Sequence, residues 1–555
     1  VGNQNLAQGF EIQPFVAAGQ GQSPPQHQRR TAADQAAHFS FRYRSAANCA
    51  QRVVQGDGKV ARRVEQGSIK VEADNFEAVR GHRWAIGSGR WNPQSFGGMS
   101  AAMSASDTPL AVIVLAAGKG TRMKSDLHKV LHPIAGHPML LHLLGSLGEV
   151  GIDRQVIVAG DRREQIEAAL ADSGAEVVVQ DPQLGTAHAA LMAKPALADF
   201  NGLVLVCFGD VPFLSAATVR RLCAALTGDA RVAVLGFRPA DTAAYGRIIA
   251  DADGTVRKMV EHKDASTEER AVNLCNSGVI VAHSNDMWRL LDAVGNDNAA
   301  GEYYLPDVAT NAIAEGARVV VVETDESEVM GVNSRAELAE AEARWQQRRR
   351  KQAMDDGASL IAPETVWFAW DTRLGRDVMI EPNVFFGPGV TVADGVKIRA
   401  NCHIEGASLA LGVEVGPFAR LRPGTVLEEK AKVGNFVEVK KATMCKGAKA
   451  NHLTYIGDAE VGAGANIGAG TITCNYDGYF KYKTIIGERA FIGSNSSLVA
   501  PVKIGADAIV GAGSAVTRDV AAGELRIVRG EQLVKPGWAD RFHDAMKKKK
   551  AEKKG

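Results

Sequence analysis

Large apolar residues recur at every sixth position in the C-terminal part of the chain. The first series is Leu374, Ile380, Phe386, Val392, Ile398 and Ile404. Two later series, each in a new phase, run from Val415 to Val439 and from Ile486 to Val516. Neither an amphipathic helix nor an alternating strand places one large apolar residue in six, because their periods are 3.6 and 2. In a parallel β-helix each hexapeptide supplies one short strand and one turn. The pattern therefore predicts a parallel β-helix with about eight coils between Leu374 and Val520, in a domain of residues 358–540. We expect this β-helix to be left-handed.

A different pattern precedes the β-helix. Across residues 109–333, short apolar runs alternate with segments of helix length. The runs are AVIVLAA, QVIVAG, AEVVVQ, LVLVCFGD, RVAVLGF, NSGVIVA and RVVVVET. Such alternation predicts an α/β domain with a mainly parallel sheet. Residues 334–357 are rich in Ala, Glu, Arg and Gln, and we expect a connecting helix there that ends at the Asp-Asp-Gly of 355–357.

The two ends of the chain lack both patterns. Residues 1–108 are rich in Gln, Arg, Ala, Gly and Ser and show no sustained apolar period, which predicts a disordered or non-native extension. Residues 541–555 form a Lys-rich tail. A solvated, mobile end is the ordinary interpretation of such a charge run, and we prefer it to a nucleic-acid-binding role.

Composition narrows the classes of partner. The 64 Lys and Arg residues balance 63 Asp and Glu residues, and a net charge of +1 gives no electrostatic reason to expect nucleic acid or membrane as partner. No apolar stretch is long enough to span a bilayer. The seven cysteines are odd in number and include no C-x-x-C pair. They argue against a disulfide framework and a structural zinc site, and they suit the reducing cytoplasm.

The first candidate chemistry follows the first apolar run. Leu115-Ala116-Ala117-Gly118 continues into Lys119, Gly120, Thr121 and Arg122, and Lys129 lies a short distance beyond. Two glycines permit close approach of the backbone to a ligand, and the three cations add positive charge, so this segment suits a polyphosphate. It matches neither the P-loop nor the dinucleotide-binding motif. A tight turn without a ligand is the alternative.

The same motif carries a resemblance to a known family. L-A-A-G-x-G-T-R-M followed by a lysine is similar to the signature of sugar-1-phosphate nucleotidyltransferases. The matching positions beyond it are Gln180, Gly185, Thr186, Phe208, Gly209, Asp210, Tyr245, Gly246, Arg247, Glu261, Asn276, Gly331, Val332 and Asn333. In order and spacing they resemble the bifunctional UDP-N-acetylglucosamine pyrophosphorylases and glucosamine-1-phosphate N-acetyltransferases. The resemblance covers residue 110 to the tail and implies a Rossmann-like nucleotidyltransferase domain before the β-helix.

By this resemblance, UTP and UDP-N-acetylglucosamine would contact Leu115, Ala116, Ala117, Gly118, Lys129, Gln180, Gly185, Thr186, Phe208, Gly209, Asp210, Gly246, Glu261, Asn276 and Asn333. Gly246, Glu261 and Asn276 would hold the sugar. Asp210 and Asn333 would bind Mg²⁺, and Asp210 also ends a strand, where α/β domains place their ligands. A helix N-cap is the alternative role for Asp210. Lys129 and Arg122 would act in catalysis by neutralising phosphate charge. The chain departs from the family at Phe208, which replaces Tyr, and at Ser334, which replaces Asn.

A second chemistry is implied on the β-helix, where the six-residue period breaks near His452. Acetyl transfer to an amine needs a base, and a histidine suits that role. The resemblance makes His452 the catalytic base, although an ordinary surface or core histidine is the alternative. It assigns glucosamine-1-phosphate to Arg422, Lys440, Tyr455 and Asn466, of which Arg422 and Lys440 also suit a phosphate on chemical grounds. It assigns acetyl-CoA to Ala469, Asn475, Tyr476, Ser494, Ala512 and Arg529.

We therefore predict a two-step enzyme that makes UDP-N-acetylglucosamine for cell-wall precursors. It would use acetyl-CoA and UTP as co-substrates, with Mg²⁺. The alternatives are another sugar nucleotidyltransferase whose β-helix is purely structural, and a non-enzymatic protein with decayed sites. The resemblance implies a homotrimer, which flat-sided prisms favour. Small molecules would be its ligands, without nucleic acid or membrane insertion.

Overall fold

The computed structural model describes residues 108–242, 245–298 and 300–553, so the prediction for residues 1–107 lies outside the described residues. All seven predicted apolar runs form strands. They are β1 (Leu110–Ala116), β4 (Arg154–Ala159), β5 (Glu176–Val179), β6 (Leu203–Phe208), β7 (Ala230–Phe237), β10 (Cys275–His283) and β11 (Arg318–Thr324). Their order in the sheet is β11-β7-β10-β6-β1-β4-β5. Only β10 runs antiparallel to its neighbours in this path, which confirms a mainly parallel sheet.

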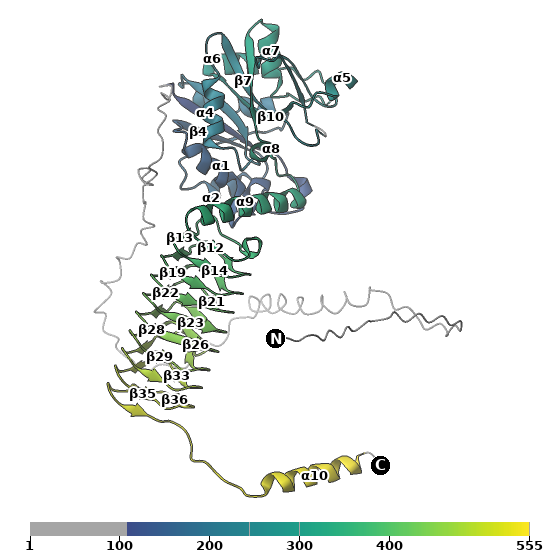
Figure 1. Ribbon diagram of the computed structural model, residues 1–555. Coiled ribbons are helices and arrows are strands. Elements are labelled where there is room, and N and C mark those ends of the chain that lie inside the picture. Colours follow the sequence, from purple (N-terminus) through teal and green to yellow (C-terminus); the bar gives the residue numbers. More distant parts are fainter. Residues whose placement is uncertain (1–107, 243–244, 299, 554–555) are drawn as a thin grey trace, which may run out of the picture. The chain divides into compact units, whose positions relative to one another are not determined.

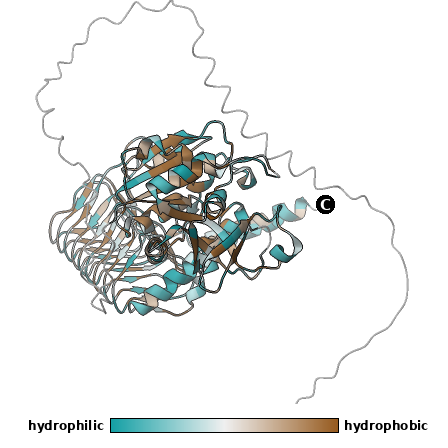
Figure 2. Cartoon of the chain, turned by 90° about the horizontal axis from the view of Figure 1, so that it is seen from above, coloured by the Kyte–Doolittle hydropathy of each residue, from teal (hydrophilic) through white to brown (hydrophobic). Residues whose placement is uncertain are grey.

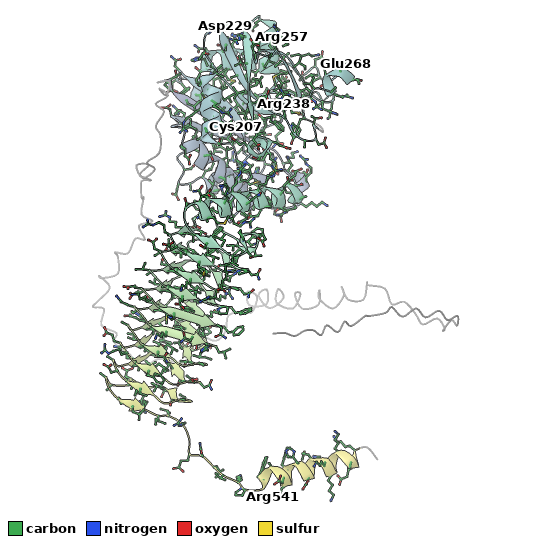
Figure 3. The ribbon with its side chains drawn as sticks, in the orientation of Figure 1. Cys207, Asp229, Arg238, Arg257, Glu268 and Arg541 are labelled. Carbon is green, nitrogen blue, oxygen red and sulfur yellow. The ribbon has the colours of Figure 1, made fainter. Side chains whose placement is uncertain are left out.

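Helices cover both faces of the sheet (Figure 1). One face packs against α1 (Met139–Gly148) and α4 (Ala216–Ala224), and the other against α3 (Thr186–Leu191), α6 (Ser284–Asp292) and α7 (Asp307–Ala314). Figure 2 shows the strands in the brown of hydrophobic residues. Cys207 of β6 lies within this core (Figure 3), where burial raises the pKa of its thiol to about 12. A thiol so far from ionisation serves packing.

Shorter elements complete the α/β part. The additional strands are β2 (Pro133–Ile134), β3 (His137–Pro138), β8 (Arg247–Ala250) and β9 (Val256–Val260). The additional α-helices are α2 (Arg163–Ala169), α5 (Thr267–Arg270) and α8 (Glu326–Val329). The 3-10 turns are η2 (Thr121–Met123), η3 (Lys129–Leu131) and η4 (Pro195–Leu197). β8 and β9 form an antiparallel pair that joins the sheet through β10.

Helix α9 (Arg335–Asp355) follows the α/β part, and a reciprocal cap fixes its start. The Ser334 hydroxyl accepts a hydrogen bond from the Glu337 amide, while the Glu337 carboxylate accepts from the amides of Asn333 and Ser334. Serine and asparagine serve almost equally well as N-caps. The Ser334 departure therefore preserves the helix start that positions Asn333.

The C-terminal part is a parallel β-helix with three sheets, as the six-residue period predicts, and it is consistent with the left-handed form. The first sheet contains β12 (Ser359–Leu360), β14 (Met379–Ile380), β17 (Lys397–Ile398), β20 (Glu414–Val415), β23 (Lys432–Asn435), β26 (Lys449–His452), β29 (Asn466–Ile467), β32 (Phe491–Ile492), β35 (Ile509–Val510) and β37 (Leu525–Arg526). The second contains β13 (Arg373–Leu374), β16 (Thr391–Val392), β19 (Ala407–Leu409), β22 (Thr425–Leu427), β25 (Thr443–Met444), β28 (Ala459–Val461), β31 (Thr484–Ile486) and β34 (Val502–Ile504). The third contains β15 (Phe385–Phe386), β18 (His403–Ile404), β21 (Arg420–Leu421), β24 (Glu438–Lys440), β27 (Tyr455–Gly457), β30 (Ile472–Cys474), β33 (Ser497–Val499) and β36 (Ala515–Val516).

The periodic side chains stack inside the prism. Ile380 pairs in register with Ile398, and Ile398 pairs with Val415 one coil further on, and all three are fully buried. The first phase change in the sequence is a five-residue step from Ile404 to Leu409, and both residues remain in the core. The β-helix therefore continues without interruption at this step.

Two segments leave the regular coils. Between β30 and β31 the chain makes an excursion, in which Tyr476 and Lys481 form an isolated antiparallel bridge and Tyr479 and Phe480 are exposed. After β37 the chain reaches helix α10 (Trp538–Glu552), which bears Arg541 (Figure 3). The short turn η5 (Pro363–Thr365) lies near the start of the β-helix. Within the part of the chain that the structure describes, no helix has the length and apolarity to cross a bilayer.

Candidate active sites

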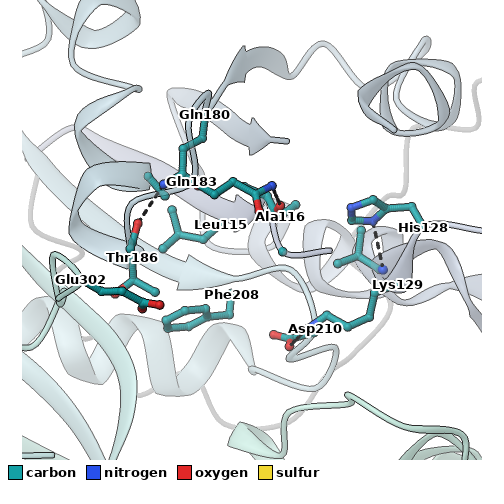
Figure 4. A pocket seen from close by; sticks show the side chains of 15 residues that line it. Leu115, Ala116, His128, Lys129, Gln180, Gln183, Thr186, Phe208, Asp210 and Glu302 are labelled. Carbon is teal, nitrogen blue, oxygen red and sulfur yellow. Dashed lines mark hydrogen bonds and ion pairs between the residues drawn. The ribbon is translucent and has the colours of Figure 1, made fainter. Parts of the chain in front are cut away.

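A pocket of about 300 Å³ opens at the carboxyl edge of the parallel sheet. Strands β1 and β6 are neighbours, and both end at this edge, with Gly118 following β1 and Asp210 following β6. The predicted residues that line it are Leu115, Ala116, Ala117, Gly118, Lys129, Gln180, Gly185, Thr186, Phe208 and Asp210. Figure 4 shows Thr186 and Glu302 on one side of this pocket and His128 on the other. Residues far apart in the sequence thus converge on one cavity.

The Lys129 side chain holds the two predicted metal ligands together. Its ammonium lies 2.5 Å from Asp210 Oδ2 and 3.1 Å from Asn333 Oδ1. Lys129 and Asp210 are each only 15% exposed, so water screens this pair weakly. Two oxygen atoms that already share one cation form a donor set suited to a hard metal ion.

Position 185 in the pocket wall requires glycine, because the backbone of Tyr303 lies close to it. Gly185 has a φ of 125°, and a Cβ there would lie 2.4 Å from the Tyr303 carbonyl oxygen. Gln180 donates a hydrogen bond of 2.9 Å to the Gly185 carbonyl, and the Thr186 hydroxyl accepts one from the Leu305 amide. These contacts fix the backbone of the wall around Gly185.

Three further predicted residues, Gly246, Glu261 and Asn276, form a neighbouring group outside the lining of this pocket. The Asn276 amide donates to the Gly246 carbonyl at 2.9 Å, and a Cβ on Gly246 would lie 3.2 Å from Glu261 Oε1. Burial, followed by the nearby carboxylates of Asp307 and Asp264, raises the pKa of Glu261. A partly buried acid with hydrogen-bonding capacity left over suits a polar, uncharged ligand such as a sugar.

On the β-helix, one column of equivalent positions contains the predicted base. Val433, Ala450, Ile467, Ile492 and Val510 pair in register on five successive coils. Two positions beyond each of them stand Asn435, His452, Ala469, Ser494 and Ala512. The last three side chains are small, and Ser494 and Ala512 are exposed. The Ala512 carbonyl accepts a hydrogen bond from Arg529 at 2.9 Å, which places Arg529 beside this column.

Cationic side chains gather on neighbouring coils. Arg422 donates to Glu438 Oε1 at 2.8 Å, and Lys440 lies close enough to Lys481 that this second ammonium lowers the pKa of Lys440. Tyr455 pairs in register with Glu438. The positive charges of Lys440 and Lys481 repel each other, and a bound phosphate would relieve this repulsion.

The remaining predicted residues of this site lie around the excursion or beside the column. Asn475 donates to Asp458 Oδ2 at 2.5 Å, whereas Tyr476 is 60% exposed and donates to the Gly478 carbonyl. Asn466 is half-buried on β29, three positions before Ala469 of the column. No direct contact joins Asn475, Tyr476 or Asn466 to His452 among the hydrogen bonds of the described residues.

Comparison with known proteins places both parts in established families. Residues 112–293 match the MobA-like NTP transferase domain. Residues 371–406 match the bacterial transferase hexapeptide (six repeats), and residues 483–518 match the hexapeptide repeat of succinyl-transferase. The bifunctional protein GlmU of Novosphingobium aromaticivorans is 72% identical over 451 residues, which cover 81% of this chain and all of that protein. This chain belongs to the GlmU family.

Other relatives agree. The bifunctional protein GlmU of Sphingopyxis alaskensis is 67% identical over 80% of this chain and 99% of its own length, and that of Rhizorhabdus wittichii is 64% identical over 81% and 100%. As a member of this family the protein is a glucosamine-1-phosphate N-acetyltransferase and an N-acetylglucosamine-1-phosphate uridylyltransferase. The comparisons give no support to a purely structural β-helix.

Some predicted residues stand apart from the nucleotide pocket. Arg122 is exposed on η2 and does not line it. Gly209 is also outside the lining, but its amide donates to the Leu115 carbonyl and ties the ends of β6 and β1 together. The ring of Phe208 packs against Gly278, where a Cβ would lie 2.4 Å from a ring carbon. The Phe208 departure is therefore accommodated by an apolar contact.

Several residues of these sites escaped the sequence reasoning. They are His128, Gln183 and Glu302 in the pocket, and Asn435, Glu438 and Lys481 on the β-helix. Burial, with Lys129 as the next cause, lowers the pKa of His128 to about 4, so this ring is neutral at pH 7. Its Nε2 is buried and has no hydrogen-bond partner among the described residues. The sequence contained one indication that His128 belongs to the site, namely its position directly before Lys129.

Proposed function

We propose that the pocket at the sheet edge performs uridylyl transfer and that the column around His452 performs acetyl transfer. The observation that carries the first assignment is the Lys129 ammonium between Asp210 and Asn333, beside the Gly118 turn. In uridylyl transfer, a phosphate oxygen of N-acetylglucosamine-1-phosphate attacks the α-phosphorus of UTP, and the bond to pyrophosphate breaks. Both reactants are anionic, so this step requires positive charge in the pocket.

The oxygen atoms of Asp210 and Asn333 would hold Mg²⁺. When bound, the ion neutralises phosphate charge and aligns the reactants. Among the described residues, no cluster of three or more His, Cys, Asp and Glu side chains could hold a metal ion. Two protein oxygens fit the usual coordination of Mg²⁺, which binds through one or two side chains together with substrate phosphates and water.

Lys129 would then turn from Asp210 toward the phosphates, and Gly118 would let the backbone approach them. Gln180, Gly185 and Thr186 form the wall that would contact the nucleotide. Gly246, Glu261 and Asn276 would bind the hydroxyl groups of the sugar. Arg122 reaches the phosphates in this proposal only if its exposed side chain swings into the pocket.

For acetyl transfer, His452 Nε2 would take a proton from the amine of glucosamine-1-phosphate. The amine nitrogen forms a bond to the thioester carbonyl, the carbon–sulfur bond breaks, and CoA leaves as the thiolate that regains the proton. Arg422 and Lys440 would hold the phosphate, with Tyr455 and Asn466 at the sugar. The small residues Ala469, Ser494 and Ala512 would lie along acetyl-CoA, with Asn475, Tyr476 and Arg529 at its edges.

We further propose that the protein is a cytoplasmic homotrimer. Phe418, Phe436 and Leu453 occupy successive coils and are 50%, 55% and 62% exposed, with the two phenyl rings stacked at 5.1 Å. Other copies of the chain would cover this apolar ladder. The six described cysteines are free, which supports a reducing compartment. Sedimentation of the purified protein as a monomer would contradict the trimer.

The experiment that tests both sites supplies purified protein with acetyl-CoA, glucosamine-1-phosphate, UTP and Mg²⁺. CoA release and pyrophosphate release are measured separately. Chelation of divalent metal by EDTA should stop pyrophosphate release and leave CoA release unchanged. Equal loss of both products on chelation would contradict the assignment of the metal to the nucleotide pocket alone.

A further inference from the structure

Within the described ranges, the side chain of the candidate base His452 has a single side-chain hydrogen-bond partner, and that partner is uncharged. His452 ends strand β26, and Asn435 ends the register-paired strand β23 on the preceding coil. The distance between His452 Nδ1 and Asn435 Oδ1 is 2.6 Å. No ion pair between His452 and a carboxylate occurs in the described part of the chain. The environment of Nδ1 is therefore set by the amide of Asn435.

The backbone holds the two side chains against each other. A Cβ on Gly434 would lie only 1.9 Å from the Asn451 carbonyl oxygen, so the chains approach too closely at this point for any other residue. The Leu453 amide donates to the Asn435 carbonyl at 3.0 Å, and the Thr454 hydroxyl donates to the His452 carbonyl at 2.7 Å. The close approach at Gly434 and the hydrogen bonds from Leu453 and Thr454 thus hold the backbone of Asn435 and His452 in place.

We propose that Asn435 is the positioning residue that selects the catalytic tautomer of His452. An amide oxygen can only accept a hydrogen bond, so Nδ1 must carry the ring proton. The lone pair is then at Nε2, on the opposite side of the ring. Without Asn435 the proton can occupy either nitrogen, and a ring protonated at Nε2 cannot take a proton from an amine there. This inference rests on the proposed role of His452 as the base.

The Asn435 side chain is uncharged, and this affects which protonation form of the His452 ring is favoured. A carboxylate at this position would stabilise the imidazolium form, which has no lone pair to accept a proton. An amide orients the ring without favouring its charged form. Asparagine therefore keeps the base free at lower pH than aspartate would.

The test compares Asn435→Ala and Asn435→Asp across a pH series of acetyl transfer. Asn435→Ala should lower kcat/KM on the plateau by about 10-fold, the effect of one lost orienting hydrogen bond. Asn435→Asp keeps the shape and the acceptor, so it should retain plateau activity. Its added charge should move the acidic limb of the profile upward by about one pH unit. If Asn435 served folding alone, its variants would lower acetyl transfer by the same factor at every pH. The acidic limb of the pH profile would then stay where it is in the wild type.

Two controls accompany these variants. Uridylyl transfer, measured on the same samples with N-acetylglucosamine-1-phosphate supplied directly, reports on the other site and should not change. Thr391→Ala removes a coil-to-coil hydrogen bond to Ser408 of 3.2 Å, remote from His452 in sequence and on another sheet, and should leave acetyl transfer at the wild-type rate.

The outcomes separate this inference from the function on which it rests. Wild-type kcat/KM in Asn435→Ala, or a wild-type pH profile in Asn435→Asp, would overturn the positioning role. His452→Ala is assayed in parallel. If His452→Ala retained acetyl transfer, the base assignment itself would fail, whatever the Asn435 variants did.

Discussion

The Lys129 ammonium and the Asp210 carboxylate form a hydrogen-bonded ion pair of 2.5 Å across 81 positions of sequence. The pair places a cation of the protein where the proposed metal ligands converge. A bound metal ion and the lysine would therefore compete for the same carboxylate, and Asp210 would release Lys129 for phosphate when the metal binds.

Replacement of Lys129 by methionine should have two effects. Uridylyl transfer should fall by about 10²- to 10³-fold in kcat, because one charged donor to the phosphates is lost. The nucleotide-free variant should bind Mn²⁺ more tightly than wild type, because no ammonium occupies Asp210. Pyrophosphate release and Mn²⁺ titration by electron paramagnetic resonance measure the two effects. Lys194→Met, which breaks an exposed Lys–Asp pair of 2.6 Å in the same domain, is the matched control. Unchanged Mn²⁺ affinity would refute the competition.

The two active sites should fail independently. Asp210→Ala should abolish uridylyl transfer and spare acetyl transfer, because it removes a proposed metal ligand and touches nothing on the β-helix. His452→Ala should lower acetyl transfer by about 10²- to 10⁴-fold, as expected for a general base, and spare uridylyl transfer. CoA release is measured with acetyl-CoA and glucosamine-1-phosphate, and pyrophosphate release is measured separately with UTP and supplied N-acetylglucosamine-1-phosphate. Loss of both activities in either variant would show that the sites are not independent.

The inward stack of the β-helix should dominate its stability. Ile398 is fully buried between Ile380 and Val415, so Ile398→Ala should lower the free energy of unfolding by about 2–5 kcal/mol. The adjacent Lys397 is exposed, and Lys397→Ala should change this free energy by less than about 0.5 kcal/mol. Chemical denaturation of both variants measures the difference. Similar losses at the two positions would contradict the inward and outward alternation.

Glu261 should make the stability depend on pH. Because burial raises its pKa in the folded state, the folded protein retains a proton that the unfolded chain has already lost. This effect stabilises the fold below the ordinary glutamate pKa and disappears as pH rises through the folded value. Glu261→Gln should therefore raise the melting temperature at pH 7.5 and raise it less at pH 5.

The exposed Glu167 on α2 supplies the matched control for that experiment. Glu167→Gln should leave the melting temperature nearly unchanged at both pH values. A gain from Glu261→Gln that was larger at pH 5 than at pH 7.5 would reverse the sign of the argument and refute it.

Much of the fold could be predicted from local pattern. The seven apolar runs became strands because buried parallel strands need continuous apolar sequence. The six-residue series became stacked coils because one inward side chain per hexapeptide fills the prism. The pair β8 and β9 was missed, because the apolar runs in Arg247–Ala250 and Val256–Val260 are short and charged residues of both signs lie within and between them.

The candidate sites likewise contain residues that could be predicted from the sequence and residues that could not. The Gly-rich turn by itself nominated Gly118 and Lys129, whereas the nomination of Asp210 and His452 depended mainly on the family resemblance. Asn435 lies in no such motif, because its importance comes from the coil that stacks beneath His452. Glu438 and Lys481 were missed for the same reason: their partners Arg422 and Lys440 are neighbours only across coils or across the excursion.

The order of residues by itself determined the two architectures, the Gly-rich turn and the identity of the reactive side chains. Only the tertiary structure decided that Lys129 lies between Asp210 and Asn333, and that an amide faces His452 Nδ1. Periodicity records which side chains are buried within an element, because burial follows the local geometry of strand and coil. It does not record which elements become neighbours, because that depends on the packing of the whole sheet and the stacking of whole coils.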